Sequence, residues 1–355
     1  MATGCSPRAN VRFPRVLTDL APAAGAVGAG FAVLFAGLAL TGYDAPRAMA
    51  AMIGGGLGSG DAILSALLPR AIPLIIIGLG IGLAFRAGAL NIGAEGQFQV
   101  GAIAATWAGL ALGDWPRSLA VPVVLAAGCA AGAGWASIPA ALRLRFGVLE
   151  VISTLVLNFI AEALLSWMVQ GPLQEPTHVY PQSAMLPPSA RLPALPGSRL
   201  HLGLLVALLA AAGLGILQRK TLFGFQMRAA GENPDAARIV GRVNTSRVFA
   251  FALLASGGLA GVAGASEVSG TTFALFQNLS PGYGFTGIAV ALLAKLDPLA
   301  TIVTGLLFAA IEAGASAMQR EAGVPAIAAY MVEATITIMV LLGDAARRRR
   351  LPEAA

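Results

Sequence analysis

The sequence has few of the residues from which enzymes and nucleotide-binding proteins build their sites. Its only lysines are Lys220 and Lys295, and neither completes the GxxxxGK[ST] loop that binds ATP phosphates. Its only histidines, His178 and His201, form no HExxH pair and have no cysteine partners, which argues against a zinc site. No GxSxG nucleophile elbow is present. We therefore expect no catalytic residues, no metal and no cofactor.

Cysteine and charge are also scarce. Cys129 falls inside an apolar run, so it cannot belong to a disulfide framework with Cys5. Charged residues make up 11% of the 355 residues, whereas soluble domains carry roughly 25%. Together with 57% hydrophobic residues and a mean hydropathy of +0.78, this predicts an integral membrane protein. The net charge of +6 is then a topology signal, and no nucleic-acid partner is expected.

The apolar runs are about 20 residues long, which is the length of a membrane-spanning helix rather than of a barrel strand. We therefore predict an all-α polytopic membrane protein that forms a single transmembrane domain over residues 1–355. The eighth run is short, which predicts a half-span or a tilted helix. The ten predicted spans are 21–41, 63–85, 91–112, 119–141, 148–170, 201–218, 247–269, 283–296, 298–317 and 325–343.

The distribution of basic residues predicts the orientation of these spans. With the N-terminus inside, 17 of the 23 basic residues fall in cytoplasmic segments and 5 in external ones, while Arg70 has no clear place. Both termini are thus predicted to be cytoplasmic. The predicted segments outside the membrane are a cytoplasmic tail at 1–20, an external proline-rich cap at 171–200, a cytoplasmic loop at 219–247 and a cytoplasmic tail at 344–355.

A polar stretch, RAGALNIGAEGQFQVGA, interrupts the apolar runs over residues 86–102. Lipid cannot satisfy free backbone and side-chain polar groups, so this stretch must face protein or a water-filled path. Asn91, Glu95 and Gln97 are candidate path residues on this reasoning. The same pattern is also that of a helix start, with Asn91 as the cap and Glu95 in the first turn.

Further polar residues fall within the predicted spans, among them Asn158, Glu162, Glu267, Glu312 and Glu333. Acidic side chains at this depth often mark a transport path, although an amide can equally join two helices. No basic residue within the spans clearly pairs with these acids, so a proton relay of the usual Asp/Glu/His kind is poorly supported.

The basic internal loop contains RAAGENPDAARIVGR at its centre. Asn233 is placed to cap a helix that has Pro234 near its start and Asp235 in its first turn. This pattern predicts a short amphipathic helix over about residues 234–240. An interaction helix and a solvated connecting loop are the two alternatives.

Several motifs, in order along one chain, resemble those of a known family. They are FRAGALNIGAEGQ at 85–97, STLVLNFIA at 153–161, RAAGENPDAARIVG at 228–241, GYGFTGIAVALL at 282–293 and the external GPLQEP…PQSAMLPPSARLP. Together they resemble the membrane permeases of ABC importers of the ribose and branched-chain amino acid type. The similarity is closest to nucleoside (simple-sugar-like) permeases that work with a basic-membrane-lipoprotein receptor, and it runs from about residue 64 to 342.

The resemblance implies a multi-pass permease subunit in the inner (plasma) membrane, which translocates a nucleoside or simple sugar into the cytoplasm. An ABC ATPase subunit would hydrolyse ATP, a second, shorter permease would complete a heterodimer, and an external substrate-binding lipoprotein would deliver the substrate. The implied substrate path includes Asn91, Glu95, Gln97, Asn158, Phe285 and Thr286. The implied ATPase-coupling loop includes Gly231, Glu232, Asn233, Pro234, Ala236, Ala237, Arg238 and Gly241.

Two departures from the family pattern bear on these expectations. Arg242 stands where relatives commonly have an aliphatic residue, and Thr286 stands where some relatives carry an acid. The small residues Ala236, Ala237 and Gly241 would let the loop helix seat closely in a cleft of the ATPase.

An ion-coupled secondary transporter of a small polar solute is the alternative. Such carriers usually show inverted repeats, and no clear internal repeat is visible here. A non-transporting membrane scaffold would explain the 44 glycines but not the patterned internal loop. The residues leave open whether the substrate is a nucleoside or a sugar and whether the dimer is homo- or heteromeric.

Overall fold

The computed structural model describes residues 16–113, 115–241 and 243–350. Within these ranges every regular element is a helix, as the apolar composition predicts. Each of the ten predicted spans contains a helix, and their bounds are α1 Val16–Leu40, α4 Leu68–Arg86, α5 Ala94–Leu112, α6 Arg117–Phe146, α7 Glu150–Gln170, α8 Gly203–Lys220, α11 Thr245–Glu267, α12 Tyr283–Leu293, α13 Pro298–Ala322 and α14 Ala329–Arg350.

Six helical segments in the described ranges are long and apolar enough to cross a membrane. They are Gly60–Arg86, Arg117–Phe146, Glu150–Gln170, Gly203–Lys220, Thr245–Thr272 and Pro298–Ala322. Gly25–Leu40, Tyr283–Leu293 and Tyr330–Met339 are shorter apolar helices. The chain is thus a multi-pass membrane protein, while the count of ten spans and their orientation stay predictions.

The remaining helices connect or extend the spans. α2 (Ala45–Leu57) follows α1, and a short α3 (Gly60–Ala62) with a π-helical turn η1 (Ile63–Leu67) leads into α4. α9 (Leu222–Glu232) and α10 (Pro234–Gly241) form the predicted internal loop. A second π-helical turn, η3 (Val268–Thr272), extends α11, and two 3₁₀ turns are η2 (Pro188–Ala190) and η4 (Ala326–Ala328).

Helix α2 was not expected, because its glycine-rich sequence lies in what the hydropathy pattern predicts to be an external connection. Asp44 begins the helix by accepting a hydrogen bond from the backbone N–H of Arg47 at 3.1 Å. The helix then packs closely against α13: a Cβ built on Gly56 would lie 2.7 Å from the carbonyl oxygen of Ala310. The glycines that weaken α2 as an isolated helix are therefore what allows it to dock.

Close packing of small residues also joins α6 to α11. Gly128 and Gly132 lie one turn apart on α6, and they face Gly257 and Gly261 on α11. A Cβ built on Gly261 would lie only 2.0 Å from the carbonyl oxygen of Gly128, so the two backbones are in direct contact. This is the small-residue packing that the glycine content predicts for helices in a membrane.

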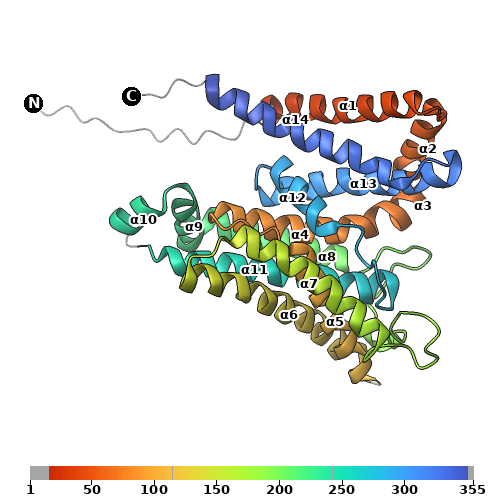
Figure 1. The fold of residues 1–355 in the computed structure, drawn as a ribbon, viewed down its shortest axis with the longest axis horizontal. Helices are drawn as coiled ribbons and strands as arrows, with labels where there is room; N and C mark the ends of the chain where they lie inside the picture. The colour runs from red at the N-terminus through yellow and green to blue at the C-terminus, as the bar shows by residue number, and fades with distance from the viewer. Residues whose placement is uncertain (1–15, 114, 242, 351–355) are drawn as a thin grey trace, which may run out of the picture.

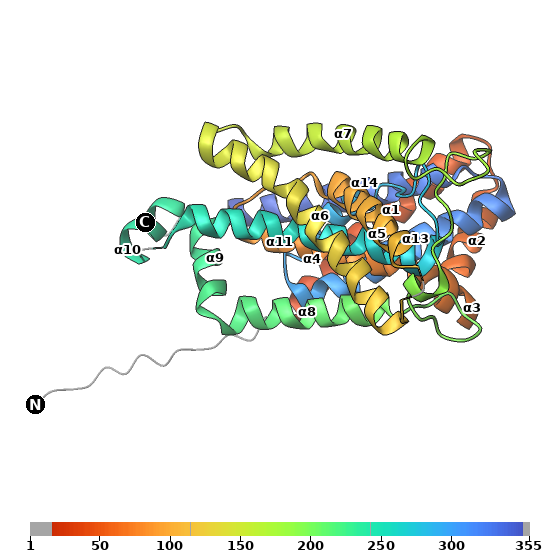
Figure 2. The same cartoon turned by 90° about the horizontal axis from the view of Figure 1, so that it is seen from below.

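Figure 1 shows α1 and α14 side by side along one edge of the molecule, and α6 and α7 along the opposite edge. α4 lies between them, and most of its side chains from Ala71 to Ala84 are buried. α9 and α10 project from one end of the bundle, and the segment 171–200 covers the other (Figure 2). The helices run lengthwise between these ends, which places the internal loop and the proline-rich cap on opposite sides.

The proline-rich cap is irregular but well connected, as expected from its composition. Isolated bridges join Gln182 to Phe276 and Ala194 to His201. The Arg117 guanidinium donates to the carbonyl oxygen of Pro188 at 3.0 Å. Burial lowers the pKa of His201 to about 4. Its Nδ1 accepts from the Gly203 N–H at 3.2 Å, as a neutral ring can.

Candidate functional site

Helix α5 begins inside the bundle rather than at its end. α4 ends at Arg86, the chain runs without helical structure to Gly93, and α5 starts at Ala94. A Cβ built on Gly96 would lie 3.0 Å from the Cα of Asn158, which is near the middle of α7. The backbone groups of this first interrupted segment are therefore at a depth where lipid could not satisfy them.

Side-chain amides satisfy some of those groups and link them to neighbouring helices. Asn91 is fully buried, and its Nδ2 donates to Gln97 Oε1 at 2.8 Å and to Ser256 Oγ at 2.9 Å. Its Oδ1 accepts from the Gly93 N–H at 3.0 Å and from Gln97 Nε2 at 3.1 Å. Asn91 thus ties the start of α5 to α11, but it does not cap the helix as predicted: Gly93 is the N-cap, and it has no side chain to cap α5. Glu95 does lie in the first turn, as the helix-start interpretation predicts.

Asn158 braces the same segment from α7. Its Oδ1 accepts from the N–H of Gly96 at 2.9 Å, and its Nδ2 donates to the carbonyl oxygen of Ile92 at 3.0 Å. Gly96 is in the first turn of α5, whose N–H groups have no partner within the helix. Asn158 therefore supplies one of these missing acceptors across the helix interface.

A second interrupted segment meets the first at Glu95. η3 ends at Thr272, and α12 starts only at Tyr283 after a non-helical run. Glu95 Oε2 accepts from the N–H of Gly284 in the first turn of α12 at 2.7 Å. A carboxylate is favourable there, because helix N-termini carry partial positive charge and free N–H groups.

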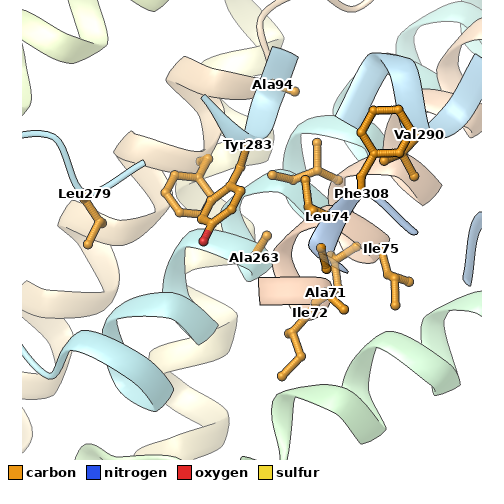
Figure 3. Packing of buried hydrophobic residues seen from close by; sticks show 14 of the residues in the cluster. Ala71, Ile72, Leu74, Ile75, Ala94, Ala263, Leu279, Tyr283, Val290 and Phe308 are labelled. Carbon is orange, nitrogen blue, oxygen red and sulfur yellow. The ribbon is translucent and has the colours of Figure 1, made fainter. Parts of the chain in front are cut away.

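The two segments also pack closely around this contact. A Cβ on Gly284 would lie 2.2 Å from the backbone nitrogen of Glu95, so no larger residue fits. The ring of Tyr283 meets that of Phe98 edge-on at 5.9 Å between centroids. Figure 3 shows Tyr283 near Ala94 and Ala263, within the main hydrophobic core.

α12 confirms the expectation of a short eighth element. Its 11 residues measure about 16 Å at 1.5 Å per residue, against about 30 Å for the hydrocarbon core. Discontinuous helices whose ends meet inside a bundle are typical of binding sites in transporters.

A cavity of about 550 Å³ opens beside α12, between this helix and α14. Phe285 and Thr286, both predicted path residues, line it together with Glu333. Thr286 Oγ1 donates to Glu333 Oε2 at 3.1 Å. The sequence identifies Glu333 as an acid within a span. It does not predict the contact with Thr286, because the two residues are 47 positions apart.

A smaller cavity of about 360 Å³ adjoins the first, and both are lined by Pro281 and Tyr330. The Tyr330 hydroxyl donates to the carbonyl oxygen of Pro281 and so stands between them. Arg70, whose place the hydropathy pattern leaves open, lines the smaller cavity with Glu312. Its guanidinium donates to Ser316 Oγ at 3.3 Å.

The internal loop begins its second helix where the sequence predicts. Pro234 is the first residue of α10, and Asn233 Oδ1 caps the helix by accepting from the N–H of Ala236 at 3.0 Å. Ala237 is only 7% exposed and belongs to the small core cluster that holds α9 and α10 to α11. Ile239 is 81% exposed instead. The outward face of α10 is therefore centred on Ile239 rather than on Ala237.

The other predicted coupling residues are distributed over this loop. Gly231, Glu232, Asn233, Pro234, Ala236 and Arg238 are exposed, and Gly241 is the last residue of α10. Arg238 Nε donates to Thr245 Oγ1 at 2.6 Å, which joins α10 to the start of α11. Arg242 lies outside the described residues.

The loop contacts the end of α4 directly. A Cβ on Gly231 would lie 2.3 Å from the carbonyl oxygen of Arg86, and Gly88 packs on the same glycine. Arg219 forms an ion pair with Asp297 beside this contact. Burial raises the pKa of Asp297, but hydrogen bonds from Arg219 and the Ala300 N–H outweigh it and leave that pKa below its usual value. The loop thus touches the residues that lead into the first interrupted segment.

The chain matches one known protein family and several known permeases. Residues 63–341 match the family described as the branched-chain amino acid transport system permease component. The chain is 36% identical over 299 residues to the glucose ABC transporter permease protein TsgB13 of Haloferax volcanii, covering 81% of this chain and 78% of that protein.

Two relatives carry nucleoside names. The chain is 38% identical over 279 residues to the guanosine ABC transporter permease protein NupP of Bacillus subtilis, covering 78% of this chain and 80% of that protein. It is 32% identical over 279 residues to the nucleoside ABC transporter permease protein NupB of Lactococcus lactis, covering 76% of each. No solved structure matches the chain significantly.

Proposed function

This chain belongs to the family of permease components of branched-chain amino acid transport systems, and from that premise we propose that it carries a nucleoside or a simple sugar into the cytoplasm. It is a permease subunit of an ABC transporter rather than an enzyme, as its relatives are. The observation that carries the proposal is the meeting of two interrupted helices at Glu95 and Gly284. Neither a scaffold nor a simple bundle needs broken helices inside its core.

The substrate class rests on the names of the relatives. Guanosine and glucose permeases match this chain at similar identity, and a nucleoside and a hexose share a hydroxylated ring. The ion-coupled carrier is not favoured, because the relatives are ABC permeases. We favour the nucleoside, on the motif likeness of residues 153–161 and the external cap.

The family implies an ATPase and a substrate-binding protein as partners. We propose further that the binding protein is an external lipoprotein, and that a second, shorter permease completes a heterodimer in the inner membrane. The basic residues support cytoplasmic termini, with 171–200 external and 219–247 cytoplasmic. Reporter fusions after Leu217 and Leu342 should both report the cytoplasm, and an external signal from either would refute ten spans.

The substrate path is proposed to pass the two interrupted segments. Phe285 and Thr286 line the larger cavity and would contact substrate. Asn91, Gln97 and Asn158 use their polar atoms on neighbouring protein groups, which supports a bracing role. Glu95 would hold the two segments in register, so that a shift of one moves the other.

Coupling is proposed to run through α10. A movement of α10 caused by the ATPase would be transmitted to Gly231 near the end of α9. Gly231 contacts Arg86 and Gly88. From Gly88 the chain runs on to Asn91 and Glu95, so fewer than ten residues separate the point of contact with the loop from the path. This gives a permease without an ATP site a mechanical link to ATP hydrolysis.

The test is uptake by the assembled transporter in proteoliposomes. ATP inside the vesicles should drive accumulation of labelled guanosine or glucose when the ATPase and the binding protein are present. Uptake that persists without the ATPase but requires a proton or sodium gradient would refute the ABC mechanism. A transporter that moves branched-chain amino acids but neither of these solutes would refute the substrate class.

A further inference from the structure

The cavity between α12 and α14 is lined mostly by apolar residues, with a few polar groups among them. Thr286, Glu333 and Thr337 are polar, while Phe285 and Ile338 are among the apolar residues. Its volume of about 550 Å³ lies within the range of roughly 300–1,000 Å³ that is typical of small-molecule sites. The cavity is thus large enough for a nucleoside or a hexose.

One polar atom of the lining residues has no partner. Glu333 is 6% exposed, and its Oε2 accepts from Thr286 Oγ1 at 3.1 Å. Its Oε1 is buried and accepts no hydrogen bond from any described residue. Buried polar atoms without a partner are rare in proteins and costly. Because Glu333 also lines the cavity, a small turn of its carboxyl group would bring this oxygen to a donor on a ligand.

The lining also limits what that ligand can be. No lysine or arginine is among the described residues that line the larger cavity, so a phosphate or carboxylate group would find no countercharge. Phe285 and Tyr330 offer aromatic surface on the same cavity. Carboxyl oxygens with aromatic surface suit a neutral ring that carries hydroxyl donors on its edge and C–H groups on its face.

We propose that Glu333 and Thr286 bind the hydroxyl groups of a sugar ring, either the ribose of a nucleoside or a free hexose. The ring packs against Phe285, and its vicinal hydroxyls donate to the carboxyl oxygen that has no other partner. Glu333 thereby selects sugars in the permease itself, after the binding protein has made its own selection. This rests on the proposed function, because it assigns the substrate contacts within the same path.

The experiment compares guanosine with 2′,3′-dideoxyguanosine, and glucose with its 2-deoxy and 3-deoxy forms. ATP-driven uptake is measured in proteoliposomes for the complete transporter with wild-type permease, with Glu333→Met and with Glu333→Gln. The same binding protein serves every preparation, so its own preference cancels when selectivity ratios are compared. Methionine keeps the length of the side chain but removes both acceptors, whereas glutamine keeps one acceptor oxygen.

Glu333→Met should lower the ratio of uptake of the hydroxylated substrate to its deoxy analogue by about ten- to a hundredfold, which is the loss expected for hydrogen bonds to a carboxylate at about tenfold per 1.4 kcal/mol. Glu333→Gln should retain part of the ratio. Thr335→Val on the same helix is the control, since its hydroxyl donates to the Met331 carbonyl oxygen at 2.6 Å and does not line the cavity. Co-purification of the ATPase reports whether each variant assembles.

The guanosine and glucose arms distinguish the two sources of the sugar ring. An unchanged ratio in Glu333→Met, with normal assembly, would overturn the assignment. An equal fall for substrate and deoxy analogue would also overturn it, because a structural defect does not depend on the hydroxyls. A wild-type transporter that takes up neither guanosine nor glucose would instead refute the proposed function.

Discussion

Ile239 offers a sharp test of coupling, because it is the large apolar side chain exposed among the described side chains of α10. It is 81% exposed at one end of the molecule, where no part of the described chain covers it. Ala237, the residue that sequence reasoning places in a cleft of the ATPase, lies instead in the small core cluster with Met227 and Val248. Ala237→Trp would therefore disturb the loop itself, whereas Ile239→Ala tests the outward face.

The expected magnitude follows from the atoms removed. Ile239→Ala deletes three carbon groups, which at about 0.8 kcal/mol each are worth about 2.4 kcal/mol if the ATPase buries them fully. That corresponds to about a fiftyfold loss of association, at 1.4 kcal/mol per tenfold. Alanine favours helix more than isoleucine does, so α10 itself should not weaken.

The assay is co-purification of the ATPase with the permease, combined with ATP-driven uptake. Leu195→Ala removes the same number of carbons from a half-exposed leucine in the proline-rich segment at the opposite end, and it is the matched control. We expect Ile239→Ala to lose the ATPase and Leu195→Ala to keep it. If both variants retain the ATPase and wild-type uptake, α10 is a solvated connector and the proposed coupling route is wrong.

Three further predictions test the interior. Glu95→Gln keeps the shape of the side chain but exchanges a charged acceptor for a neutral one at the Gly284 N–H. Uptake should therefore fall about fivefold, for a loss of about 1 kcal/mol, while assembly stays intact. Unchanged uptake would show that the charge has no role in the mechanism. Gly132→Val should destabilise the protein by about 3 kcal/mol or more, since its Cβ would lie 2.2 Å from a carbonyl oxygen of α11, whereas Gly134→Val meets nothing within 4 Å; equal melting temperatures for the two variants would contradict the packing. The pKa of His201 is about 4 in the folded protein against 6.5 in the unfolded chain. The free energy of unfolding is therefore largest above pH 6.5, where His201 is neutral in both states. It falls as pH drops toward 4, by about 2 kcal/mol at pH 5. His201→Gln should therefore lose less stability than wild type between pH 7.5 and 5 in thermal unfolding, and parallel losses would refute the assignment.

The positions of the main helices could be predicted because lipid imposes a strong local rule. A run of about 20 apolar residues must form a helix that satisfies its own backbone, and each predicted run does contain one. α2 escaped this reasoning, because its glycines depress both hydropathy and helix propensity. Only the surface of α13, which accepts those glycines closely, makes that segment a packed helix.

For the polar residues, the sequence shows which ones are unusual, whereas the tertiary structure decides what they bind. Their presence within apolar runs was enough to mark Asn91, Glu95 and Asn158 as unusual, because an unsatisfied polar group in a membrane is costly wherever it lies. Their roles depend on partners that are distant in sequence: Asn91 bonds to Ser256, and Glu95 to Gly284. No local pattern specifies such pairs.

In the internal loop, α10 shows the same distinction between what local sequence determines and what tertiary packing decides. Asn233 and Pro234 fixed the start of α10 from sequence alone, since capping is a local interaction. Which face of α10 turns outward was not local, because Ala237 and Ile239 are both apolar and the helix has only eight residues. Packing against α9 and α11 decided it: the small side chain of Ala237 fits against the bundle, and the larger Ile239 is left outside.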